Sequence, residues 1–291
     1  MNIMKLTSVF FTFILLMTVT GCKKTNDNTV FTTYDQFVNL KPGKVIVYRL
    51  DSIVTKAFGT SFITASYTVK DSVGSEITDN SNRKVFRVFR FEFDPARRTW
   101  KPTNTFSYTP TENTLEFVEN NYRYVKLVNP VSELRTWMGN NFVSGPVFHQ
   151  NSFFQTWKFF YKDVNQPKMV GAFNLPKTLT VVQYDSLENK PFDKFSFSTY
   201  DKGYEIYADT IGLVYRDIIS WEYQPTIKVT NCKHTFPSSG GTTTVNINCN
   251  LPGANCDSIR KLPNQTIRCD STLENFFYDG YGIKQTMLQH N

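Results

Sequence analysis

The chain alternates between apolar and polar residues over many short stretches, and this two-residue period is typical of β-strands with one buried face. The period is clearest in Val85–Phe93, where the three later phenylalanines fall on one face and Arg90 and Glu92 fall on the other. Phenylalanine and tyrosine are also the commonest large residues of the other patterned stretches. The pattern therefore predicts that aromatic side chains alternate inward and fill the core of a curved sheet.

Stretches rich in β-branched and aromatic residues follow one another along most of the chain. Pro110 and the pair Asn120-Asn121 separate three of them, which indicates short hairpins. About ten to twelve strands are expected. Helical spacing is limited to Phe31–Leu40 and to one or two turns in Ser132–Met138. The predicted fold class is mainly β, a single antiparallel, strongly curved sheet or barrel-like meander with one or two short helices.

The N-terminus has the features of an export signal. Lys5 precedes an apolar run, and Val19-Thr20-Gly21-Cys22 ends it like the lipobox of bacterial lipoproteins. Residues 1–21 are predicted to be a lipoprotein signal peptide, Cys22 the acylated residue, and 22–30 a flexible tether ahead of a single domain at 31–291. The alternative is an ordinary signal peptide with a cysteine there by chance. Two or three acyl chains would anchor the protein stably, and the residue after Cys22 favours the outer membrane.

Four further cysteines, Cys232, Cys249, Cys256 and Cys269, all lie in the last sixty residues. An exported chain meets an oxidising compartment, so this even set predicts two disulfides, with three possible pairings. A metal site that includes His234 is the alternative, but the closely spaced ligand pairs of zinc sites are missing. Residues 229–272 are poor in apolar side chains, which predicts a loop insertion stapled by the disulfides.

Composition narrows the function classes. Hydrophobic residues make up 40% and charged residues 20%, so the chain can build a core. The net charge of +7 becomes +6 when the leader takes Lys5, and the basic residues are scattered at most in pairs, which argues against nucleic-acid binding. The aromatic residues either fill the core or line a groove for a lipid or glycan. Trp100 and Trp137, which have polar neighbours in loop-like stretches, are the candidate ligand contacts.

Two segments carry a resemblance to a known kind of protein. Tyr207–Tyr215 (YADTIGLVY), continued to Trp221–Pro225 (WEYQP), and the C-terminal segment Gly280–Asn291 resemble parts of small lipoproteins of the Bacteroidota. The resemblance implies an extracytoplasmic antiparallel sheet, and no activity is assigned to that family. Physically, Gly212 predicts a bend or a close backbone approach in a strand.

A second pattern fits that origin. Asp-[Ser/Thr] followed by an apolar residue or threonine resembles the O-glycosylation signal of exported proteins of that phylum. It occurs six times, an excess over what composition predicts, and the candidate acceptors are Ser52, Ser72, Ser186, Thr210, Ser258 and Ser271. The alternative is that Asp-Ser begins turns before β-branched strand residues.

Catalytic motifs are missing from the sequence, and no catalytic residue, metal or cofactor is predicted. His149 could act as a general base, but it has no nucleophile nearby in sequence. The pairs Glu112/Glu116 and Glu116/Glu119 could serve a glycosidase if they converged in space. The favoured function is a non-catalytic, envelope-anchored binding module for a glycan, a lipid or an envelope protein. The alternatives are a carboxylate-dependent envelope hydrolase and a structural subunit of an envelope complex.

Overall fold

The computed structural model describes residues 32–144, 154–187, 192–251, 256 and 265–291. Residues 32–291 form one compact unit. Strands make up 71% of the structure and helices 4%, with no helix as long as seven residues among those described, which confirms the mainly β prediction. No helix of the described residues is long and apolar enough to cross a membrane.

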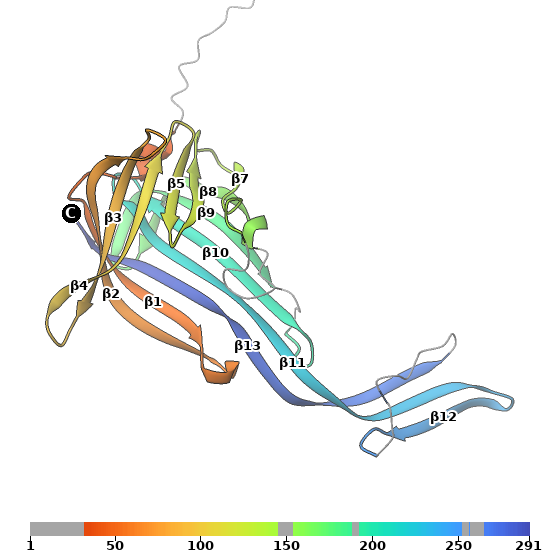
Figure 1. Cartoon of the computed structure of the whole chain (residues 1–291). Helices are drawn as coiled ribbons and strands as arrows, with labels where there is room; N and C mark the ends of the chain where they lie inside the picture. Colours follow the sequence, from red (N-terminus) through yellow and green to blue (C-terminus); the bar gives the residue numbers. More distant parts are fainter. Residues whose placement is uncertain (1–31, 145–153, 188–191, 252–255, 257–264) are drawn as a thin grey trace, which may run out of the picture. The chain divides into compact units, whose positions relative to one another are not determined.

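The described elements are almost all strands, thirteen in number, with three short 3-10 turns (Figure 1). In chain order they are η1 (Tyr34–Phe37), β1 (Val45–Thr55), η2 (Ala57–Gly59), β2 (Phe62–Thr78), β3 (Lys84–Asp94), β4 (Thr99–Pro110), β5 (Thr114–Glu119), β6 (Tyr122–Val128), β7 (Thr136–Met138), η3 (Phe154–Thr156), β8 (Lys158–Val170), β9 (Phe173–Leu187), β10 (Ser198–Ala208), β11 (Gly212–Ser238), β12 (Gly241–Asn248) and β13 (Thr266–His290).

Twelve of these strands form one antiparallel sheet that is nearly closed into a barrel. Their order is β6-β5-β4-β3-β2-β1-β13-β11-β10-β9-β8-β7, so β6 and β7 are the two edges. The edges meet where the Val125 N–H donates to the Gly139 carbonyl (2.8 Å) and the Trp137 indole N–H donates to the Val125 carbonyl (2.9 Å). A barrel of this many strands is wider than its side chains can fill, so its interior can hold a cavity.

The inward and outward faces of β3 are the reverse of the sequence prediction. Arg90 is buried inside the barrel with Val88, while Phe89 lies on the outer face and is 39% exposed. Two contacts explain the reversal. Inside the barrel, Arg90 donates two hydrogen bonds to the carboxylate of Asp71 on β2. Outside, the Phe89 ring covers Gly74, where a Cβ atom would lie only 2.7 Å from the ring.

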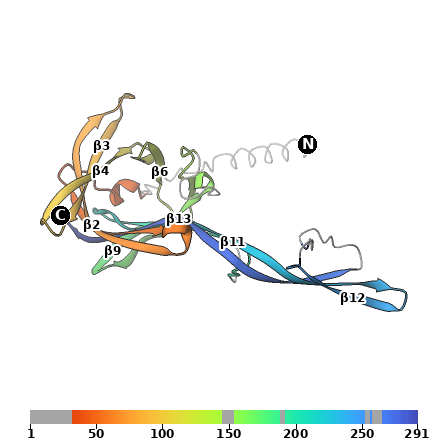
Figure 2. The ribbon, with the colours of Figure 1, turned by 60° about the horizontal axis from the view of Figure 1, so that its bottom comes forward.

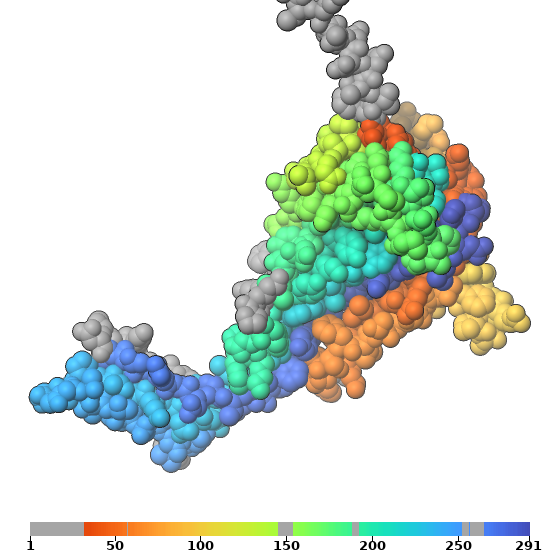
Figure 3. Space-filling model, turned by 180° about the vertical axis from the view of Figure 1, so that it is seen from behind, coloured from red at the N-terminus to blue at the C-terminus, as the bar shows by residue number. Residues whose placement is uncertain are grey.

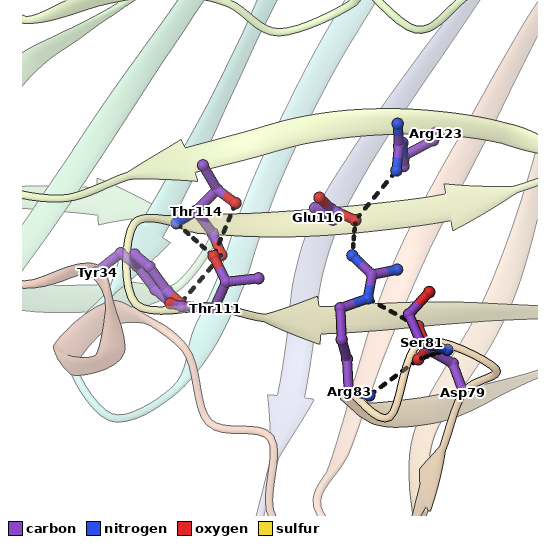
Figure 4. Close-up of polar contacts among 8 residues, drawn as sticks. All are labelled: Tyr34, Asp79, Ser81, Arg83, Thr111, Thr114, Glu116 and Arg123. Carbon is purple, nitrogen blue, oxygen red and sulfur yellow. Dashed lines mark hydrogen bonds and ion pairs between the residues drawn. The ribbon is translucent and has the colours of Figure 1, made fainter.

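Residues 32–44, which precede β1 and which we call the capping segment, pack against one end of the barrel (Figure 1). The predicted helix over 31–40 is shorter in the structure, the four-residue turn η1. Tyr34 and Phe37 are buried in the main core cluster. The Tyr34 hydroxyl donates to the carbonyls of Thr111 and Thr114 in the β4–β5 turn (Figure 4). This segment therefore caps the barrel at that end.

The predicted helical turns in Ser132–Met138 are not observed. The last three residues form strand β7, which pairs with β8. The extended backbone places the Trp137 ring against Tyr161, with ring centroids 4.6 Å apart, and against Phe159 at 5.8 Å. Packing at the barrel seam thus outweighs the local helical spacing.

Strands β11 and β13 continue past the barrel as a ribbon, which we define as residues 224–251 with 265–280. β10 pairs with β11 only as far as Tyr223, and β1 pairs with β13 only as far as Tyr281. Beyond these points the two strands pair with each other, and β11 also pairs with β12. Figures 1 and 2 show that the ribbon extends beyond the ends of the other strands. The space-filling view shows the ribbon in blue (Figure 3).

The predicted loop insertion at 229–272 is therefore largely a β-ribbon. Its threonines and valines are β-branched and favour strands even where little apolar area is buried. The predicted disulfides are confirmed, and the structure selects one of the three pairings, Cys232–Cys269 and Cys249–Cys256. The first bond joins β11 to β13 across the ribbon at paired positions.

Candidate ligand-binding cavity

The inner face of the barrel lines a partly open cavity of about 460 Å³. This volume lies in the range of about 300–1,000 Å³ that small-molecule sites occupy, and at about 30 Å³ each it would hold some 15 waters. Inward-facing residues of β1–β6, β9, β11 and β13 line it, together with Asn120, Asn140 and Phe154. We call this space the barrel cavity.

A second, smaller cavity of about 60 Å³ lies between the barrel cavity and the capping segment. Its lining is mostly apolar and includes Val38 and Leu40 of the cap. Arg90, Phe117 and Arg216 line both cavities. These three residues therefore separate the two spaces, and with Lys126 we call them the cavity floor.

A buried ion network supports the floor. One carboxylate oxygen of Glu205 (β10) accepts from Lys126 Nζ at 2.8 Å and from Arg216 Nε at 2.7 Å, and the other accepts from the Tyr207 hydroxyl at 2.8 Å. Burial alone would raise the pKa of Glu205, but the charges of Lys126 and Arg216 overcome burial and lower it to about 2. The carboxylate is thus ionised across the physiological pH range and balances one of its two cations.

The pKa values of Lys126 and Arg216 are shifted in opposite directions. Burial lowers the pKa of Lys126, and Glu205 only partly offsets that effect. For Arg216, burial also opposes the charge, but the attraction of Glu205 prevails and raises the pKa. The Phe117 ring lies beneath both cations, 5.4 Å from Lys126 Nζ and 5.8 Å from the Arg216 guanidinium carbon, which adds cation–π attraction.

Arg90, the third cation of the floor, is neutralised by its own partner. Its Nε and Nη2 atoms each donate to a carboxylate oxygen of Asp71 at 2.7 Å, in the two-point geometry that guanidinium and carboxylate favour. Nη2 also donates to Gln285 Oε1 at 3.3 Å. Arg90 therefore adds no net charge to the floor.

Two buried amides on the cavity wall have an atom without a hydrogen-bond partner. Asn140 and Gln183 are 0% and 1% exposed and line the barrel cavity, yet Asn140 Oδ1 and Gln183 Nε2 are unpaired in the described structure. Gly203 makes room for Gln183, because a Cβ atom there would lie 2.9 Å from its Oε1. A buried polar atom left unpaired costs about 1–3 kcal/mol, so these atoms are suited to a polar ligand or water in the cavity.

Two carboxylates line the cavity further from its floor. Glu92 follows Arg90 by two residues on β3, and Glu119 follows Phe117 by two residues on β5. In each of these pairs both residues face inward. Because a strand rises about 3.3 Å per residue, the backbone of each glutamate lies roughly 7 Å beyond the floor along its strand. Asn104 Nδ2 donates to Glu119 Oε1 at 2.8 Å. The cavity thus has cations at its floor and carboxylates farther out.

The two predicted ligand-contact tryptophans do not line the barrel cavity. Both lie in strands instead of loops. Trp100 on β4 packs across Phe93 on the outer face, with Lys70 Nζ 4.5 Å from its ring. Trp137 donates its indole N–H at the barrel seam. The aromatic residues that line the cavity are Tyr67, Phe117, Tyr124, Phe154 and Tyr281.

The predicted carboxylate pairs do not converge. Glu112 is exposed in the β4–β5 turn, Glu116 faces outward, and Glu119 faces the cavity. Glu116 accepts from Arg83 at 3.0 Å and lies 3.8 Å from Arg123 (Figure 4). Residues three apart on a strand point to opposite faces, which explains why Glu116 and Glu119 separate.

The candidate glycosylation acceptors occupy different surroundings. Ser186 and Thr210 are exposed, Ser72 and Ser271 are half-buried on strands, and Ser52 is half-buried and lines the barrel cavity. Thr210 lies in the β10–β11 turn at φ +61°, where its amide and carbonyl bond Gln36 and Asn39 of the cap. Cys22, His149 and Ser258 lie outside the described residues.

Cys232, Cys249 and Cys269 lie in the ribbon, Cys256 is bonded to it through Cys249, and none of the four lines the barrel cavity. The sulfurs of Cys232, Cys249 and Cys256 lie within 4.8 Å of one another. All three belong to disulfides in the structure, whereas a metal site needs free thiolates, so metal binding here would require reduction of both bonds. His234 bonds Gln265 at 2.6 Å.

Sequence reasoning missed Glu205, Lys126 and Arg216. Each is a charged residue within a strand, but β10 and β11 have other polar residues at the same period, such as Asp201 and Ser220, so no local signal distinguished the members of the network. Tyr207 begins the YADTIGLVY segment, and Arg216 directly follows it. Comparison of the chain with protein-family models, with curated proteins and with solved structures gave no match. The cavity is therefore interpreted from its own geometry.

Proposed function

We propose that this protein is a lipid-anchored envelope lipoprotein, of the kind found in the Bacteroidota, whose barrel cavity binds a small glycan. The observation that supports the proposal most is the lining of the 460 Å³ cavity. Aromatic rings such as Tyr67, Tyr124 and Tyr281 offer stacking faces, and amides, hydroxyls and carboxylates offer hydrogen bonds. Sugars, which have apolar ring faces and many hydroxyls, complement this mixture.

The charges favour a glycan over a lipid tail. An acyl chain in the barrel cavity would exclude water from Arg216, Glu92 and Glu119 without replacing its hydrogen bonds, which costs several kcal/mol. Glycan hydroxyls can donate to carboxylates and accept from cations. A protein partner fits less well, because the unpaired atoms of Asn140 and Gln183 are too deeply buried for a surface contact.

The place where the described chain begins is consistent with the proposal that the protein has a lipid anchor ahead of the barrel. The Thr32 carbonyl accepts from the Val131 N–H at 2.8 Å, so the described chain begins beside the capping segment. The proposed acylated Cys22 precedes this point by ten residues. A tether of this length would join the acylated residue to the first described residues of the barrel domain.

Titration calorimetry of the full-length chain in detergent tests the proposal with a panel of neutral and acidic di- to tetrasaccharides. We expect saturable binding by at least one class. Ser52→Tyr would place a ring in the cavity and should abolish binding, whereas Ser186→Tyr, on the exposed part of β9, should not. Binding that survives Ser52→Tyr, or binding of fatty acids in place of every saccharide, would contradict the proposal.

A hydrolase is the second candidate, because Glu92 and Glu119 line the same cavity. A pair of carboxylates can act as acid and base toward a glycosidic bond. Chromatography of the bound oligosaccharide after long incubation separates the two functions. Cleavage that is lost in both Glu92→Gln and Glu119→Gln, with binding retained, would favour the hydrolase. An intact ligand would leave binding as the function.

A further inference from the structure

The cavity floor has hydrogen-bond donors that the protein does not use. The hydrogen bond of the Arg216 guanidinium runs through Nε to Glu205, and no described residue accepts from its two Nη atoms. Lys126 donates one of its three N–H groups, also to Glu205. Two cations thus share one carboxylate, and both line the barrel cavity.

Gln183 adds a third donor to the lining of the barrel cavity. Its Nε2 is buried and unpaired among the described residues. The three donors line the same cavity from three strands, Gln183 from β9, Lys126 from β6 and Arg216 from β11. Unpaired N–H donors that line one cavity beside a net positive charge are suited to bind an oxyanion.

We infer that the ligand is an acidic glycan, whose carboxylate binds to Arg216, Lys126 and Gln183 at the cavity floor. This inference rests on the proposed function and names the class of sugar, one with a uronate-type carboxylate. The carboxylate pairs the second floor cation, because Glu205 balances only one of the two and the charge of Glu119 attracts them without a hydrogen bond to either. It also satisfies the Gln183 amide.

The outer carboxylates determine the orientation of the ligand. Glu92 and Glu119, roughly 7 Å beyond the floor along their strands, repel an anionic group at their level and accept hydrogen bonds from hydroxyls. An acidic sugar therefore enters with its carboxylate first and leaves neutral hydroxyls beside Glu92 and Glu119. Arg90 takes no part in this selection, because Asp71 neutralises it.

A matched pair of ligands tests the inference by titration calorimetry on the full-length chain. The pair is a trigalactoside with a uronate at its non-reducing sugar alone and the neutral trigalactoside with the same linkage, which differ in one carboxylate. We expect the acidic trimer to bind about tenfold more tightly or better, as one charge-assisted site allows. Equal binding of the two would overturn the inference and leave the glycan proposal standing. No binding of either, or of any saccharide in the wider panel, would remove both.

Two variants test whether the cavity-lining donors cause the preference for the acidic over the neutral trimer. Arg216→Lys retains the counter-charge of Glu205 and removes the guanidinium donors, and Gln183→Met removes the unpaired amide with little change of volume. Each should reduce the preference for the acidic trimer about threefold or more while binding of the neutral trimer changes little. Arg87→Lys, at an exposed position on β3, is the matched control for the arginine change. If the preference persists in both variants, with unchanged circular dichroism, the floor does not bind the carboxylate.

Discussion

The two halves of β11 show two different ways to stabilise one strand. From Gly212 to Tyr223 its inward side chains are buried, and it lies between β10 and β13 in the barrel. From Gln224 to Ser238 most of its residues are exposed or half-buried, and its neighbours are β13 and β12 alone. The first half depends on burial and on the Glu205 network. The second half has little apolar area to bury and is cross-linked by Cys232–Cys269.

The comparison shows that strand formation and stability have separate origins in this molecule. Backbone pairing between β11 and β13 runs through both halves, with irregularities near Thr226 and Val229. What differs is the free energy that side chains add to the pairing. In the barrel the side chains also build a site, whereas in the ribbon a covalent bond replaces much of their contribution.

Glu205→Gln tests the barrel half and should have the largest effect. The substitution removes the counter-charge of Lys126 and Arg216, both buried, and leaving a buried charge unpaired costs about 3–5 kcal/mol. Urea unfolding followed by tryptophan fluorescence measures the loss. A change below 1 kcal/mol would mean that water in the cavity already screens these cations.

The pH dependence of stability tests whether Glu205 stabilises the fold through its ionised carboxylate. The pKa of Glu205 is lowered from 4.5 to about 2 in the folded state, so its contribution is complete above about pH 4.5 and is lost as the pH falls toward 2. The contribution amounts to about 3 kcal/mol. Urea midpoints between pH 6 and pH 2.5 should therefore fall more steeply for the natural protein than for Glu205→Gln. Parallel curves would contradict the assignment.

Removal of the ribbon cross-link should have a smaller and local effect. The double change Cys232→Ala and Cys269→Ala frees a loop of 37 residues, which is worth about 2–4 kcal/mol. Hydrogen exchange should accelerate in β12 and in the adjoining parts of β11 and β13, and amides of β1–β6 should stay protected. Loss of protection throughout the barrel would show that the two regions unfold as one.

A matched pair of isoleucines on β11 gives the smallest contrast. Ile218 is 7% exposed and Ile227 is 44% exposed. Ile218→Ala should destabilise the protein by about 2 kcal/mol or more, and Ile227→Ala by less than about 0.5 kcal/mol. Thermal unfolding by calorimetry measures both. Similar losses at the two positions would mean that the ribbon has a packed core of its own.

Parts of the cavity could be anticipated from sequence and parts could not. Period-two patterning placed the hairpin from β4 to β6 correctly, because turn residues at Pro110 and Asn120-Asn121 act locally. The same patterning misassigned the faces of β3. The position of Asp71 on the next strand decides which face turns inward, and no local window contains that information.

The sequence by itself determined that this chain forms a β-sheet protein and that its last four cysteines form two disulfides among themselves. Strand propensity, turns and cysteine spacing are local properties, and they act before distant strands meet. Only the tertiary structure decided that the sheet nearly closes, that Glu205, Lys126 and Arg216 meet inside it, and that a cavity remains. These depend on strands far apart in the chain, such as β6 and β10, where a buried charge is tolerated only beside its partner.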